Sequence, residues 1–146
     1  MLAASLGGLI LLGLAVYAGT LLARLKRQRD MQQLAIAARN ERILDSVRVI
    51  AHVVRDGQCD YSEGAIRLTN LLDALQIKEG RVFASEFPGL YSLYEKVKEM
   101  PTHEARRALK RNEVMKMDLE RSGYEAELEA QILKDVAQLK DFQLSR

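Results

Sequence analysis

The sequence predicts an all-α protein with one N-terminal transmembrane helix, followed by a small cytoplasmic helical domain with a long C-terminal helix. Three observations support this fold class. Residues 2–23 contain no charged side chain. Beyond them, apolar residues recur at steps of three and four, the period of an amphipathic helix. No segment shows the two-residue alternation of apolar and polar residues that is typical of a half-buried strand.

The uncharged stretch at 2–23 is predicted to be a transmembrane helix and forms the first domain, 1–23. At about 1.5 Å per residue it is long enough to cross a hydrocarbon layer of about 30 Å. A cleavable signal peptide normally begins with a basic segment, but here the first charged residue is Arg24, after the apolar stretch. We therefore expect an anchor that stays on the protein.

A basic collar at 24–29 follows the predicted span and separates it from the helical domain, 30–146. The collar consists of Arg24, Lys26, Arg27 and Arg29. Because basic residues next to a span are retained in the cytoplasm, we expect the N-terminus outside and the helical domain inside. Without these four, 22 − 4 = 18 basic residues face 20 acidic ones, so the domain is slightly acidic. This balance argues against nucleic acid as a partner.

One face of the predicted span consists of small residues. Ala15, Gly19 and Ala23 are spaced at four-residue intervals, which places them on one side of a helix. Such a face allows another transmembrane helix to approach closely. Small residues are also common in spans that make no such contact, so this face is a candidate contact surface between copies or with another protein.

The first helix of the domain is predicted over 30–56 and ends at Gly57. Whether it continues the span as one helix, or hinges at the collar, is left open by the sequence. Its apolar stripe consists of Ile36, Ile43, Leu44, Val47, Ile50, Ala51 and Val54.

Two shorter helices are predicted next. The first begins after a Ser62 cap and stops near 79–80, and the second ends before Pro101. The connection between them, 81–88, carries two phenylalanines that are expected to pack against the core.

One long helix is predicted from His103 to about Leu144, with Thr102 as its cap and a bend near Gly123. Its composition strongly favours a helix. Its expected packing stripe consists of Ala105, Ala108, Leu109, Met115, Leu119, Leu128, Ile132, Val136 and Leu139.

The residue types that could perform chemistry lie mainly near the single cysteine. His52, Asp56, Cys59 and Asp60 lie within nine residues, and His103 would join them if the long helix packed nearby. A thiolate, imidazoles and carboxylates can bind zinc or form a Cys-His nucleophilic pair. The spacing matches no established metal or catalytic motif, so we predict no metal, no cofactor and no enzyme activity. The candidate functional cluster consists of Cys59, Asp60, Glu63, His103, Glu104 and Arg106.

The densest basic patch outside the collar consists of Arg106, Arg107, Lys110 and Arg111. A phosphate-rich partner, lipid headgroups or an acidic protein surface could bind there. The alternative interpretation, which we favour from the sequence, is a solvated helix face balanced by Glu104 and Glu113.

Two segments carry a resemblance to a known family. These are residues 58–68, Gln-Cys-Asp-Tyr-Ser-Glu-Gly-Ala-Ile-Arg-Leu, and residues 101–106, Pro-Thr-His-Glu-Ala-Arg. They resemble a family of short Gram-negative bacterial inner-membrane proteins, classed only as a domain of unknown function, over nearly the whole of 30–146. The resemblance implies a bacterial inner-membrane setting and brings no activity, cofactor or partner with it.

The sequence therefore predicts a non-enzymatic, membrane-tethered interaction or scaffold module. The expected partners are the membrane and a second copy or another protein, with neither nucleic acid nor a small-molecule substrate. Two alternatives remain open. One is a metal-dependent or thiol-dependent enzyme or regulator that uses Cys59 with His52 or His103. The other is a lipid or envelope-assembly factor.

Overall fold

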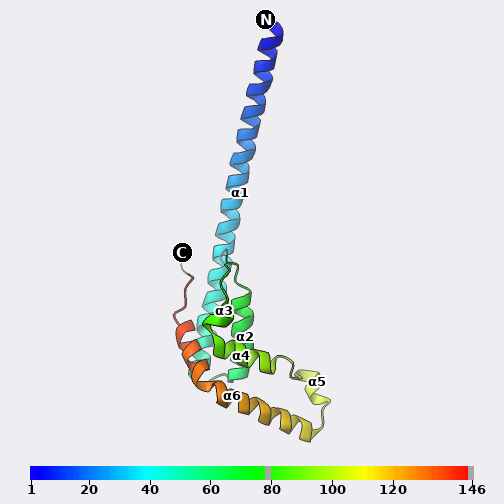
Figure 1. The fold of residues 1–146 in the computed structure, drawn as a ribbon, viewed down its shortest axis with the longest axis vertical. Coiled ribbons are helices and arrows are strands. Elements are labelled where there is room, and N and C mark those ends of the chain that lie inside the picture. The colour runs from blue at the N-terminus through cyan, green and yellow to red at the C-terminus, as the bar shows by residue number, and fades with distance from the viewer. Residues whose placement is uncertain (78–79, 145–146) are drawn as a thin grey trace. The chain divides into compact units, whose positions relative to one another are not determined.

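The computed structural model describes residues 1–77 and 80–144, and helices are the only regular secondary structure within those residues. This confirms the all-α prediction (Figure 1). The helices are α1 (Leu2–Arg55), α2 (Tyr61–Asp73), α3 (Phe83–Glu86), α4 (Pro88–Val97), α5 (His103–Arg107) and α6 (Arg111–Leu139). The chain divides into two compact units, Met1–Arg39 and Asn40–Arg146.

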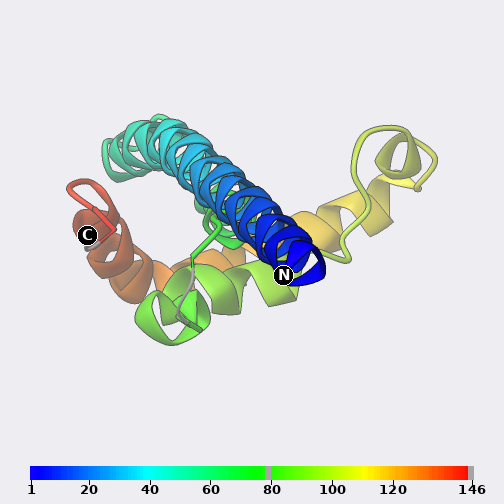
Figure 2. The same ribbon diagram turned by 90° about the horizontal axis from the view of Figure 1, so that it is seen from above.

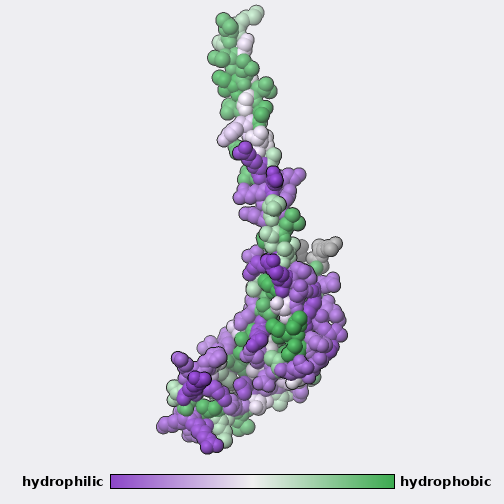
Figure 3. Space-filling model, turned by 180° about the vertical axis from the view of Figure 1, so that it is seen from behind, coloured by the Kyte–Doolittle hydropathy of each residue, from purple (hydrophilic) through white to green (hydrophobic). Residues whose placement is uncertain are grey.

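The N-terminal unit, Met1–Arg39, is the first part of α1 and contains its apolar segment. An 18-residue window of this helix has a mean hydropathy of 2.1, and none of that window is buried. The helix is therefore long and apolar enough to cross a bilayer. Figure 3 shows its apolar surface near the N-terminus, followed by a hydrophilic band. α1 is helical from Leu2 to Arg55 without interruption, so no hinge breaks it at the collar.

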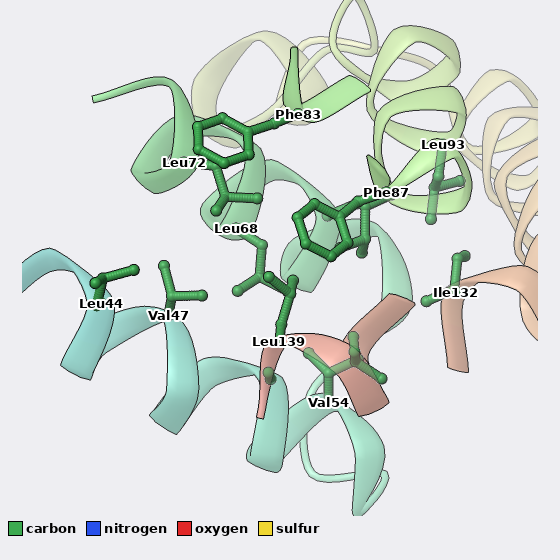
Figure 4. Close-up of a cluster of buried hydrophobic side chains, with 14 of the residues drawn as sticks. Leu44, Val47, Val54, Leu68, Leu72, Phe83, Phe87, Leu93, Ile132 and Leu139 are labelled. Atoms are coloured by element: carbon green, nitrogen blue, oxygen red, sulfur yellow. The ribbon is translucent and has the colours of Figure 1, made fainter. Parts of the chain in front are cut away.

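The core of the C-terminal unit forms where the last turns of α1 meet the other helices. Leu44, Val47, Ala51 and Val54 from α1 are buried, which confirms most of the predicted stripe. Figure 4 shows several of these residues facing Leu68, Phe87 and Leu139 from other elements. The stripe is less regular at its edges, because Ile43 and Ile50 are only partly buried and Ile36 is 37% exposed.

The start of α2 differs from the prediction that Ser62 caps it. The helix begins at Tyr61 after the extended residue Asp60, so Ser62 already lies inside its first turn. The Ser62 backbone N–H donates to Glu125 Oε1 of α6 at 3.1 Å, and the Ser62 hydroxyl donates to the same oxygen. The N-terminus of α2 is therefore bound by a carboxylate from a distant helix rather than by a local cap.

The end of α2 also differs, because the helix stops at Asp73 rather than near 79–80. Buried Asn40 of α1 binds the chain just beyond it. Asn40 Nδ2 donates to the Gln76 carbonyl at 2.7 Å, and the Gln76 N–H donates to Asn40 Oδ1 at 3.1 Å. This pair of bonds replaces the helical bonds that Gln76 would otherwise make, which favours an end to the helix. Residues 78–79 lie outside the described part of the chain.

The predicted connection at 81–88 contains the short helix α3 and the start of α4. Phe83 and Phe87 are buried, as predicted. Their rings contact the ring of Phe142, with centroids 6.2 and 5.6 Å away. α4 begins at Pro88, where proline is favoured because the first helical residue needs no N–H donor, and ends at Val97 rather than Met100.

α4 packs closely on α6 at Gly89. A Cβ atom at this position would lie 2.8 Å from the Ile132 backbone nitrogen and 2.9 Å from the Gln131 carbonyl carbon. Buried Asp135 of α6 accepts the N–H groups of Gly89 and Leu90 on one oxygen, at 2.7 and 3.1 Å. The second half of α6 is thus fixed to the core by backbone contact and by a buried carboxylate.

Candidate functional site

The long C-terminal helix that the sequence predicts is two helices. α5 covers only His103–Arg107, and α6 begins at Arg111 after a break at residues 108–110. α6 is helical through Gly123, so a bend at that residue stays a prediction, and the helix ends at Leu139 rather than near Leu144. Thr102 does precede α5 at the cap position, but its side chain makes no capping bond.

Two polar contacts lie at the break. The guanidinium of Arg106 in α5 donates to Asp118 of α6, with Nη2 and Oδ2 2.7 Å apart. The Lys110 N–H donates to Glu113 Oε2 at 2.8 Å, which supplies an acceptor at the start of α6. The Arg106 guanidinium lowers the pKa of Asp118, and Asp118 raises the pKa of Arg106, chiefly through their hydrogen bond. The pair is therefore ionised at neutral pH.

We call α5 together with residues 108–124 the arm. The buried residues of α6 are Ile132, Asp135, Val136 and Leu139, and all of them lie beyond the arm. Figures 1 and 2 show α5 and the start of α6 extending past the other helices of the C-terminal unit. The arm therefore rests on few contacts with the rest of the unit, and its conformation depends mainly on α6 and the α5–α6 ion pair.

The predicted packing stripe fails along the arm and holds beyond it. Ile132, Val136 and Leu139 are fully buried, as predicted, and Leu128 is partly buried. In the arm, by contrast, Ala105 and Ala108 are exposed, and Leu109 is only partly buried. The side chains of Met115 and Leu119 are 66% and 74% exposed, although they lie one turn apart on one face. This half of the stripe faces solvent because the arm extends past the other helices of the C-terminal unit (Figure 1).

A hollow of about 550 Å³ lies where α5 meets α6. Its walls are formed by His103, Arg106, Arg107, Leu109, Arg111 and Val114. We call it the basic hollow, because three of its six lining residues are arginines and none is acidic. Three of the four residues of the predicted basic patch, all except Lys110, therefore line a concave surface, and the break places Arg107 and Arg111 on different helices.

The arginines of the basic hollow differ in their contacts. Arg106 is bound to Asp118, as described. Arg107 and Arg111 form no ion pair or side-chain hydrogen bond with any residue in the described ranges. The two acidic residues expected to balance the patch do not contact them, because Glu113 binds the Lys110 N–H and Glu104 makes no ion pair within the same ranges. Two guanidinium groups are therefore available at one concave surface.

His103, at the start of α5, has a left-handed backbone conformation with φ of +47°. Few residues other than glycine adopt this conformation, although histidine is among the more tolerant ones. It is the only positive φ at a residue other than glycine in the described part of the chain. The turn after Pro101 thus places the His103 side chain at the rim of the basic hollow.

The predicted functional cluster is divided between two places. Cys59, Asp60 and Glu63 lie on the turn before α2 and in its first turn, whereas His103, Glu104 and Arg106 belong to α5. No hydrogen bond or ion pair joins the two sets among the described residues. Glu63 instead pairs with Arg67 at 2.5 Å. A joint role for these six residues stays a prediction.

The surroundings of Cys59 do not activate its thiol. Burial, followed by the nearby negative charge of Glu63, raises the pKa of Cys59. A nucleophilic cysteine needs the opposite shift. His52 lies 3.2 Å from Asp56 and accepts a bond from Arg55 at 3.0 Å, so it is engaged at the end of α1. No group of three or more potential metal ligands occurs within residues 1–77 and 80–144.

The predicted membrane residues lie on exposed parts of α1. The four collar residues and Ala15, Gly19 and Ala23 are all exposed, and a Cβ atom at Gly19 would meet no atom within 4 Å. Their roles in orientation and helix contact stay predictions.

Comparison with known proteins places the chain in a family. The family described as "Protein of unknown function (DUF2489)" matches residues 11–139. The chain belongs to this family. An uncharacterized protein from Haemophilus influenzae strain Rd is 38% identical over 124 residues, which is 85% of this chain and 82% of that protein. No solved structure matches the chain.

The matched range shows which parts of this chain correspond to the family. It begins inside α1 and ends at Leu139, the last residue of α6. The arm and the basic hollow therefore lie wholly within the DUF2489 region. The sequence could not reveal Asp118 as part of this site, because it lies twelve residues from Arg106 and no local motif joins the two.

Proposed function

We propose that this DUF2489 protein is a membrane-anchored interaction module that binds a partner protein through its arm. One observation carries the proposal. The arm contributes no buried residue to the core, yet it presents Met115 and Leu119 together on one face of α6. An apolar pair at i and i+4 on an exposed helix is a common way for a helix to enter a groove on another protein.

The energy available to such a contact is substantial. Burying a methionine or leucine side chain contributes about 1.5–3 kcal/mol each. The basic residues Arg111 and Lys116 flank the pair on the same helix, so the groove of the partner is expected to carry acidic groups at its edge. The partner that fits this surface is a protein with an apolar groove and an acidic rim.

The anchor of the module is α1. We propose that its apolar part crosses the bacterial inner membrane once, with the N-terminus outside and the helical unit in the cytoplasm. The length and hydropathy of the helix support the span, and the basic collar supports the orientation. The arm would then be presented to cytoplasmic proteins or to cytoplasmic parts of membrane proteins.

The orientation can be tested by cysteine labelling in spheroplasts. With Cys59→Ser as background, Leu2→Cys should react with a membrane-impermeant maleimide in intact spheroplasts. The Asp141 side chain is 82% exposed, so Asp141→Cys should react only after lysis if the helical unit is cytoplasmic. Labelling of both positions in intact spheroplasts, or the reverse pattern, would contradict the orientation.

Contact through the arm can be tested by photocrosslinking in cells. A photoreactive residue at Lys116, beside the apolar pair, should yield an adduct of defined mass. The same residue at Val49, which is exposed on α1 outside the arm, serves as the matched control and should yield none. An adduct of twice the mass of the chain would identify the partner as a second copy.

The apolar pair can then be removed without touching the core. Met115→Glu with Leu119→Glu should reduce the Lys116 adduct at least tenfold, because two side chains lose their burial at the interface. Thermal unfolding should change little, since both side chains are exposed in the free protein. An adduct that persists in this variant, or one of equal yield at Val49, would refute the arm as the binding surface.

A further inference from the structure

We infer that the basic hollow between α5 and α6 binds an oxyanion of the phosphate class, with Arg107 and Arg111 as its main ligands. This inference rests on the hollow, whereas the proposed function rests on the apolar face of the arm; Arg111 borders both surfaces. It starts from the contacts of the hollow. Among its three arginines, only Arg106 has an acidic partner within the described residues.

The ion pair of Arg106 helps to position Arg107 and Arg111. The Arg106–Asp118 pair joins α5 to α6, with Nη2 and Oδ2 2.7 Å apart, and Arg106 is one of the residues that line the hollow. Arg107 follows on the last turn of α5, and Arg111 is the first residue of α6. In one continuous helix the two would share a convex face, whereas the break lets them approach a ligand from two helices.

The chemistry of guanidinium favours phosphate over a simple halide. Each planar group offers two parallel N–H donors that match two oxygens of a phosphate, so two arginines can bind three or four oxygens. Leu109 and Val114 supply the apolar part of the lining.

The size of the hollow fits more than a bare ion. At about 550 Å³ and open to solvent, it has room for a phosphate together with the group that is esterified to it. The same chemistry is offered by a free phosphate ester and by the headgroup of an anionic lipid. The experiment must therefore measure phosphate binding first and then separate these two sources.

The test uses the full chain in nanodiscs of phosphatidylcholine and phosphorus NMR of added inorganic phosphate. Saturable broadening of the phosphate signal is expected. Arg107→Gln with Arg111→Gln should weaken binding at least tenfold, because each lost charge-assisted contact is worth roughly a tenfold change or more. Both side chains are exposed in the arm, so thermal unfolding should stay close to that of the wild type.

The matched control removes two positive charges elsewhere. Arg42→Gln with Lys134→Gln changes two exposed residues outside the hollow and should leave phosphate binding within about twofold of the wild type. Equal losses in the two double variants would show a general charge effect and overturn the site. Absence of saturable binding by the wild-type chain would overturn it as well.

Nanodiscs that also contain phosphatidylglycerol distinguish the source of the phosphate. If headgroups occupy the hollow, added phosphate should bind more weakly in the nanodiscs with phosphatidylglycerol than in those of phosphatidylcholine alone. This difference should require Arg107 and Arg111. If the hollow takes a soluble phosphate ester, the affinity should be the same in both discs. Either result supports the anion site. If phosphatidylglycerol weakens phosphate binding to the same extent in the Arg107→Gln, Arg111→Gln variant, the lipid acts outside the hollow. That result would count against a headgroup as the ligand.

Discussion

Replacing Gly89 by alanine should destabilise the C-terminal unit by about 3 kcal/mol, as expected when atoms are forced into a well-packed contact. The added Cβ would lie 2.8 Å from the Ile132 nitrogen and 2.9 Å from the Gln131 carbonyl carbon. Both are backbone atoms of α6, so neither can rotate away as a flexible side chain could. The helices must separate, and separation also stretches the bonds from Asp135 to the start of α4.

The same substitution at Gly123 is the matched control. This glycine is a solvent-exposed residue in the middle of α6, and an added Cβ would meet no atom within 4 Å. Alanine should stabilise the helix there by about 0.5–1 kcal/mol, because it restricts the unfolded chain and favours helix. Urea unfolding of the full chain in detergent, monitored by circular dichroism, measures the free energy of unfolding of both variants. Similar stabilities for the two variants would mean that α4 and α6 do not approach so closely.

The contrast between these glycines shows how far the sequence could predict the fold. Periodicity located the apolar helix and the buried positions around Val47 and Val136, because local spacing decides which side chains share a face. Composition also singled out Gly123, but α6 stays helical through that residue. Gly89, the glycine that matters for packing, carried no such signal because its neighbours Gln131 and Ile132 are distant in sequence.

The two ends of α2 differ from the predictions for one physical reason. α2 ends early where Asn40 binds Gln76, and its start is bound by Glu125 of α6. In each case a side chain far along the chain supplies the partner that a local motif was expected to supply. Such long-range polar contacts override local helix propensity, which is worth only a few tenths of a kcal/mol to about 1 kcal/mol per residue.

The candidate site was predictable in composition but not in shape. The sequence identified the four basic residues of the patch, yet interpreted them as one solvated face of a continuous helix. The arrangement of Arg106, Arg107 and Arg111 around a hollow depends on the break after α5, which the Arg106–Asp118 ion pair spans. Alanine, leucine and lysine at 108–110 all favour helix, so the local sequence does not predict a break there.

Replacing Asp135 by alanine should destabilise the C-terminal unit by about 4 kcal/mol, because it leaves two buried donors without an acceptor at roughly 1–3 kcal/mol each. The first turn of α4 shows why nothing can replace this carboxylate. Pro88 has no N–H, and the Tyr91 N–H already donates to the Phe87 carbonyl. The remaining N–H groups, those of Gly89 and Leu90, both donate to Asp135, and this side chain is fully buried.

Two further variants separate the acceptor from the charge. Asp135→Asn keeps one oxygen for the two N–H groups but loses the negative charge at the positive end of α4, so a smaller loss of about 1–2 kcal/mol is expected. Asp141→Ala removes a carboxylate that is 82% exposed and should change the free energy of unfolding by less than about 0.5 kcal/mol. Urea unfolding should therefore rank the variants as Asp141→Ala, Asp135→Asn and Asp135→Ala in order of increasing loss. If Asp135→Ala proved as mild as Asp141→Ala, the carboxylate could not be what holds α4 on α6, and the support for the arm would have to come from apolar packing at Ile132 and Val136 alone.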